Sequence, residues 1–142
     1  MLVAIASAAV TSILFALALV HVYWGVAGTS QDGSSAMVPS IDGKPAFRPT
    51  SADCYLVAAA LAIAGFLVSA QGGAIPSPLP PGWNRVGAAG VGIVFVARAI
   101  GDFRLAGFFK KVHGTSFARW DTWLFSPLCL VLGVMSLWIA AA

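Results

Sequence analysis

The stretch from Met1 to Gln31 contains no Asp, Glu, Lys or Arg. A helix needs about 20 apolar residues to cross the hydrocarbon core of a bilayer, and this stretch exceeds that length. A cleaved signal peptide is the alternative, but such a peptide begins with basic residues and has an apolar stretch of only about 7–15 residues. We therefore expect a membrane span at about residues 2–27 that stays in the mature protein.

The composition of the whole chain also favours a membrane protein. Hydrophobic residues make up 59% of the 142 residues and charged residues only 9%, against about 25% charged in an ordinary soluble domain. Too few charges are present to cover a water-soluble surface, which excludes soluble enzymes and disordered tails. The net charge of +3 does not indicate nucleic-acid binding, because basic residues beside membrane spans are the usual orientation signal.

Three further apolar stretches are expected to span the membrane, at about residues 53–71, 85–103 and 122–142. A Gly- and Pro-rich segment after Gln71 cannot continue a helix and separates the second span from the third. Pro127 lies inside the fourth span, so we expect that helix to start near Asp121 and to bend at Ser126-Pro127. The predicted fold is a single all-α membrane domain, 1–142, with four transmembrane helices in an up-and-down bundle.

Basic residues in the connections predict the orientation. The first connection contains Lys44 and Arg48, the second contains only Arg85, and the third contains Arg104, Lys110, Lys111 and Arg119. Cytoplasmic loops carry an excess of Lys and Arg. The first and third connections are therefore predicted to be cytoplasmic, with both termini outside.

Small and weakly polar residues recur at helical spacing and mark the faces on which helices pack closely in lipid. The fourth span has the clearest such stripe: Thr122, Ser126, Cys129, Gly133, Ser136 and Ala140. The other spans have Ser7, Thr11, Ala18, His21 and Gly25; Ala58, Ala62, Gly65 and Ser69; and Ala88 with Gly92. Alanine-rich helices also produce such stripes by chance, so this interpretation is open for the first two spans.

Ionisable and aromatic polar residues gather at the predicted cytoplasmic end. Ionisable groups inside a membrane are costly and are functional candidates by default. We take as candidate ligand-binding residues His21, Tyr23, Trp24, Arg98, Asp102, Arg119 and Asp121. Three further basic residues are expected to contact anionic lipid head groups: Arg104, Lys110 and Lys111.

Several of these residues also have a structural interpretation. Arg98 and Asp102 are one helical turn apart and would form an internal ion pair. Thr50 and Asp53 have the spacing of a capping box, and Asp121 stands where a helix N-cap or first-turn acid belongs. An acid that serves only in an ion pair or as a helix cap would not bind a ligand.

The remaining candidates have similar alternatives. His21 lies on the packing stripe of the first span and would there be a hydrogen-bonded packing residue, and Tyr23 and Trp24 fit an interfacial aromatic belt. The chain has two His and no Glu, and we predict neither a metal site nor a cofactor. Cys54 and Cys129 sit singly on different spans and are predicted to be free packing thiols.

Two segments carry a family resemblance. They are HVYWG, His21–Gly25, and RAIGDFRLAGFFKKVHGTSFARWDTWLFSPLCL, Arg98–Leu130. Together they resemble the signature of a bacterial family of small four-span membrane proteins known as domain of unknown function 3995 (DUF3995). The first connection and the second span match only by hydropathy. The resemblance implies a multi-pass protein of the bacterial cytoplasmic (inner) membrane with a signature that includes His21, Trp24, Arg98, Asp102, Asp121 and Pro127, and it implies no reaction.

Three functions fit these residues. In the first, the protein binds or transports a small anionic or amphipathic molecule: Arg98 holds the anionic group, Asp102 orients Arg98, and His21 exchanges a proton. In the second, the chain is an accessory subunit of a larger membrane complex. In the third, which we disfavour, it is an enzyme on a lipophilic substrate with His21 or Asp102 as general base. The expected partners are the bilayer, anionic head groups, and either further copies of the chain or a larger complex, but no nucleic acid.

Overall fold

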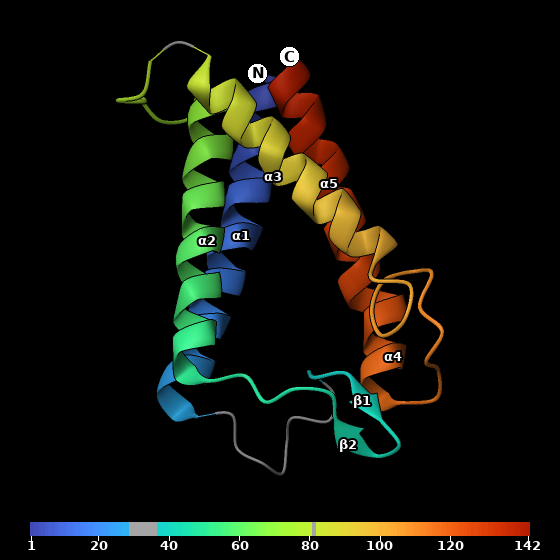
Figure 1. Cartoon of the computed structure of the whole chain (residues 1–142). Coiled ribbons are helices and arrows are strands. Elements are labelled where there is room, and N and C mark those ends of the chain that lie inside the picture. The colour runs from blue at the N-terminus through green and yellow to red at the C-terminus, as the bar shows by residue number, and fades with distance from the viewer. Residues whose placement is uncertain (29–36, 81) are drawn as a thin grey trace.

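The computed structural model describes residues 1–28, 37–80 and 82–142 (Figure 1). Part of the first connection, residues 29–36, lies outside the described residues. The described chain is mostly helical: α1 (Leu2–Ala27), α2 (Ser51–Gln71), α3 (Trp83–Ile100), α4 (Ser116–Trp120), a π-helical turn η2 (Asp121–Phe125) and α5 (Ser126–Ala141). The last three follow one another without a break.

Three helical segments are long and apolar enough to cross a membrane: Leu2–Ala27, Ser51–Gln71 and Ser116–Ala141. The prediction of a mostly helical chain is thus confirmed, and these three segments have the length and composition of membrane spans. Helix α3 has 18 residues and carries Arg85 and Arg98 near its two ends, and it is not among the helices that reach this threshold in the described chain.

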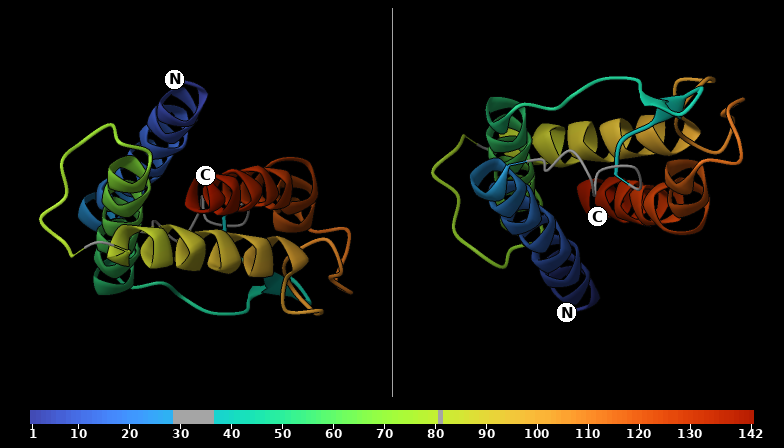
Figure 2. Two further views of the ribbon diagram at one scale, coloured as in Figure 1. Left: turned by 90° about the horizontal axis from the view of Figure 1, so that it is seen from above. Right: turned by 90° about the horizontal axis from the view of Figure 1, so that it is seen from below.

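The helices form two antiparallel hairpins, α1 with α2 and α3 with α5 (Figure 1). Both chain ends lie at one end of the molecule with residues 72–80, which we call loop 2. Residues 37–50 (loop 1) and 101–115 (loop 3) lie at the other end. The hairpins meet near the chain ends and separate towards loops 1 and 3, as the end-on views also show (Figure 2). The separation of the hairpins is a departure from the up-and-down bundle that we predicted.

Apolar side chains fill the region where the two hairpins meet. Leu14, Val68, Ala88, Leu132 and Ile139 are buried there, with each of the four long helices contributing. Because this core lies towards the chain ends, the opposite end of the molecule depends on other interactions. Those interactions include the buried Phe117, whose ring packs against Phe125, and a polar cluster that involves loop 3.

Glycines allow α3 and α5 to approach closely. A Cβ atom added at Gly133 would lie 2.8 Å from the backbone nitrogen of Val96, and one added at Gly92 would lie 2.9 Å from the carbonyl oxygen of Gly133. Both glycines belong to the predicted packing stripes, and most other members of those stripes are buried as well: Ser7, Ala18, Gly25, Ala58, Gly65, Ser69, Ala88, Ser126, Ser136 and Ala140.

The last helical segment differs from the prediction at its start. It begins at Ser116, where the Thr115 side chain accepts a hydrogen bond from the Ala118 backbone at 3.0 Å. Asp121 therefore lies inside the helix, and the capping interpretation for Asp121 is wrong. The π turn at Asp121–Phe125 ends two residues before Pro127. Proline has no N–H and crowds the preceding turn, and a widened turn relieves both problems.

Loop 1 contains a short hairpin that the sequence analysis did not predict. Strand β1 (Ser40–Ile41) pairs antiparallel with β2 (Lys44–Pro45). Asp42 and Gly43 connect the strands, and both have positive φ, at 51° and 76°. Asp-Gly is a preferred pair for such a two-residue turn.

Candidate functional site

The carboxylate of Asp121 is the centre of a polar cluster between loop 3 and the ends of α3 and η2. The residue is 0% exposed. Its Oδ1 atom accepts a hydrogen bond from Nη2 of Arg98 at 2.8 Å. Its Oδ2 atom accepts one from the backbone N–H of Gly107 at 2.8 Å and one from Nζ of Lys110 at 3.1 Å. A buried carboxylate needs such partners, because removing an unpaired charge from water is very unfavourable.

Lys110 is almost entirely enclosed in this cluster. Besides Asp121, its ammonium group donates to the carbonyl oxygen of Gly107 at 3.0 Å and to Oγ1 of Thr122 at 2.7 Å. These three contacts use all three ammonium donors. The predicted head-group contact of Lys110 therefore has to be corrected: its side chain points into the protein, and only Arg104 and Lys111 of the predicted trio are exposed.

Asp102 takes a different role from the one that the sequence indicated. Its Oδ1 atom accepts hydrogen bonds from the backbone N–H groups of Arg104 at 2.9 Å, Leu105 at 2.7 Å and Ala106 at 3.0 Å. The bond from Ala106, with those from Arg104 and Leu105, lowers the pKa of Asp102 below its ordinary value of 3.8. The expected ion pair between Arg98 and Asp102 is wrong, because α3 ends at Ile100 and Asp102 no longer lies on its face.

Two glycines fold loop 3 back against the end of α3. Gly101 and Gly107 both have positive φ, at 93° and 88°. A Cβ atom at Gly101 would collide with the carbonyl group of Ala106, and one at Gly107 would collide with the Cα atom of Gly101. The backbone N–H of Phe108 then donates to the Ala99 carbonyl at 2.8 Å. This close return aims the Gly107 N–H at Asp121.

The charges in the cluster do not cancel. Asp121 supplies one negative charge, whereas Arg98 and Lys110 supply two positive charges. The two cations also differ in access, because the Lys110 side chain is 1% exposed and the Arg98 side chain 36%. Nη1 of Arg98 is buried and has no hydrogen-bond partner among the described residues. The cluster therefore has one cationic donor without a partner in the described chain, Nη1 of Arg98, and one positive charge in excess.

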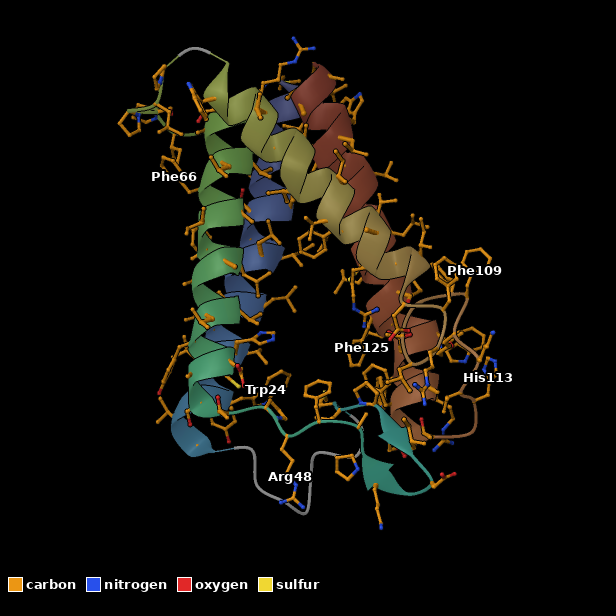
Figure 3. The ribbon with its side chains drawn as sticks, viewed as in Figure 1. Trp24, Arg48, Phe66, Phe109, His113 and Phe125 are labelled. Atoms are coloured by element: carbon orange, nitrogen blue, oxygen red, sulfur yellow. The ribbon has the colours of Figure 1, made fainter. Side chains whose placement is uncertain are left out.

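The aromatic candidates on α1 are not part of this cluster. Nδ1 of His21 lies 2.8 Å from the carbonyl oxygen of Leu17, and the imidazole ring packs edge-on against Trp24 at 5.0 Å between ring centres. Figure 3 shows Trp24 on the hairpin of α1 and α2. Phe125, which belongs to the same π turn as Asp121, lies on the other hairpin. Tyr23 is exposed. The predicted group of His21, Tyr23 and Trp24 thus lies apart from Arg98.

The other basic and acidic candidates lie at the surface or at a helix end. Arg119 is exposed on α4. The predicted capping box at the start of α2 is confirmed: Thr50 Oγ1 accepts from the Asp53 backbone at 3.2 Å, and Asp53 Oδ2 accepts from the Thr50 backbone at 2.8 Å. Within the described ranges, no three His, Cys or acidic side chains are grouped so that they could hold a metal ion.

The chain matches a known protein family. A family model described as "Protein of unknown function (DUF3995)" matches residues 14–136, which include parts of both hairpins and the whole Asp121 cluster. No curated protein and no solved structure matches the chain.

Proposed function

The chain belongs to the DUF3995 family, and we propose that this member binds or transports a small anionic or amphipathic molecule in the bacterial cytoplasmic membrane. The binding region is the end of the molecule that contains loop 3 and the Asp121 cluster. In this proposal the protein crosses the membrane four times, with loops 1 and 3 in the cytoplasm.

The packing and end charges of α3 support its role as a fourth span. Its 18 residues correspond to about 27 Å of helix at 1.5 Å per residue, close to the roughly 30 Å of a hydrocarbon core. Arg85 and Arg98 stand near opposite ends, where long basic side chains can reach the head-group region. The glycine contacts with α5 hold α3 beside the continuous helical segment Ser116–Ala141, which is long and apolar enough to span.

One observation carries the binding proposal: the cluster has one more positive than negative charge, and Nη1 of Arg98 has no partner in the described chain. A buried cationic donor without a partner is unfavourable. An anionic ligand would satisfy both the donor and the charge.

Native mass spectrometry of the protein purified in mild detergent tests this proposal. We expect a retained non-protein mass that is lost in Arg98→Ala and kept in Arg85→Ala, which removes an exposed arginine at the other end of the same helix. A spectrum without any retained mass in the unaltered protein would contradict ligand binding.

A second candidate function is an accessory subunit of a larger membrane complex. The observation that favours it is the saturation of Asp121, because Arg98, Lys110 and the Gly107 N–H already occupy both of its carboxylate oxygens. Such a cluster could serve only to fasten loop 3 to the helices. Stoichiometric co-purification of another membrane protein, together with the absence of a retained small molecule, would support this function over ligand binding.

A further inference from the structure

We propose that Nη1 of Arg98 binds the phosphate group of an anionic glycerophospholipid. The ion pair between Lys110 and Asp121 stays formed with or without the lipid. This inference rests on the proposed function and names its ligand. It also assigns different roles to the two cations, Arg98 and Lys110, which the sequence alone does not distinguish.

The contacts of the two cations differ in number and in access. Lys110 has all three of its ammonium hydrogen bonds inside the protein and a side chain that is 1% exposed. Arg98 has one bond to Asp121, from Nη2, and a side chain that is 36% exposed. Lys110 and the Gly107 N–H both hold Oδ2, so Asp121 stays paired if Arg98 shifts towards a ligand.

Guanidinium chemistry favours an oxyanion at the remaining nitrogen. Arginine presents several N–H groups in a planar fork that matches the oxygens of phosphate and carboxylate groups. One of these nitrogens, Nη1, is buried and unpartnered among the described residues. A phosphodiester carries a single negative charge, which would balance the single excess positive charge of the cluster.

The surroundings of Arg98 favour a lipid as the source of that phosphate. Arg98 lies in the last turn of α3, two positions before the helix ends at Ile100. Exposed aromatic residues follow on loop 3 and α4: Phe103, Phe108, Phe109 and Trp120. Tryptophan is enriched at the head-group level of a membrane, and exposed phenylalanine side chains can enter the adjoining apolar layer. Arg104 and Lys111 are exposed on the same loop and would attract an anionic surface.

The test is a lipid titration of the full-length protein in detergent, with the bound fraction read by native mass spectrometry. Phosphatidylglycerol is the probe, and inorganic phosphate and phosphatidylcholine are the competitors. We expect the unaltered protein to hold one phosphatidylglycerol molecule, and Arg98→Gln to weaken that binding about tenfold or more, the loss expected for a hydrogen bond to a charged group. Arg85→Gln should bind like the unaltered protein.

A second variant guards against loss of folding. Arg98→Lys keeps a cation that can pair with Asp121 but has no second terminal nitrogen, so it should fold and bind as weakly as Arg98→Gln. Normal phosphatidylglycerol binding by a folded Arg98 variant would overturn the inference. Displacement of the lipid by an equal concentration of inorganic phosphate or of phosphatidylcholine would also overturn it, because free phosphate or a neutral lipid would then satisfy the site.

The same spectra distinguish a failure of the lipid assignment from a failure of ligand binding in general. A different retained molecule that depends on Arg98 would overturn the lipid assignment and leave ligand binding in place. If the unaltered protein holds neither phosphatidylglycerol nor any other small molecule, both proposals fail.

Discussion

Asp121 has two cationic partners, and removing the acid should cost more than removing the more exposed cation, Arg98. In Asp121→Asn, Lys110 would stay enclosed without a counter-charge, and breaking a buried pair from one side typically costs about 3–5 kcal/mol. In Arg98→Gln, Asp121 would keep Lys110 and the Gly107 N–H, so the loss should be about 1–3 kcal/mol. Denaturant unfolding in detergent would measure the free energies of unfolding. Equal losses in the two variants would contradict the division of roles between Arg98 and Lys110.

Asp102 should make loop 3 sensitive to acid. Backbone N–H groups, first that of Ala106, lower its pKa in the folded protein below the ordinary value of 3.8. The carboxylate therefore stabilises the loop fully above pH 3.8, and this contribution is lost as the pH falls from there through the folded pKa. Amide hydrogen exchange of loop 3, compared between neutral pH and a pH below 3.8, should show the loss of protection.

The control for acid sensitivity is Asp102→Asn, whose amide oxygen can still accept from the backbone but does not titrate. At neutral pH, loop 3 of this variant should be less protected from amide hydrogen exchange than loop 3 of the unaltered protein. It should not change further in the acid range once the intrinsic pH dependence of exchange is subtracted. The same acid response in both proteins would show that another group is responsible.

The sequence predicted some of these residue roles and not others. The capping box at Thr50 and Asp53 was predictable because its partners are three positions apart at the start of a helix. The partner of Arg98 was not, because Asp102 has the spacing of a helical pair and the end of α3 at Ile100 is set by the fold of loop 3. Nothing in the sequence distinguishes Lys110 from Lys111, since only the path of the loop decides which one faces Asp121.

At the scale of the element, loop 3 depends on a backbone conformation that only glycine adopts easily. Gly107→Ala would place a Cβ atom at positive φ and also against the Cα atom of Gly101. The loop would have to move, and the hydrogen bond from the Gly107 N–H to Asp121 would be lost. We expect a loss of about 2–4 kcal/mol, which combines the strain of positive φ with the loss of a hydrogen bond to a charged group.

Gly114→Ala is the matched control for Gly107→Ala. Gly114 has φ of 84°, but a Cβ atom there would meet nothing within 4 Å. This variant should therefore lose only the conformational cost of about 1–2 kcal/mol. Thermal unfolding in detergent compares the two. Similar midpoints for both variants would mean that the close approach of Gly101 and Gly107 does not hold the loop.

At the scale of the molecule, the sequence predicted the helices better than the way in which they pack. Hydropathy and the stripes of small residues indicated where helices form and which faces contact, and Gly92 and Gly133 do meet. The separation of the hairpins towards loops 1 and 3 had no such signal. In lipid an exposed apolar face costs little, so hydropathy does not require the hairpins to close along their whole length.

The four-span topology makes a prediction about which loops share a side of the membrane. In a chain without its native cysteines, single cysteines would be placed at exposed positions of the three loops: Ala46→Cys, Ala74→Cys and His113→Cys. A membrane-impermeant maleimide applied to intact cells should label only the Ala74→Cys protein, because the basic residues of loops 1 and 3 favour the cytoplasmic side. After permeabilisation all three proteins should react. Labelling of both Ala74→Cys and His113→Cys in intact cells would mean that α3 does not cross the membrane, and the Asp121 cluster would then face the outer surface.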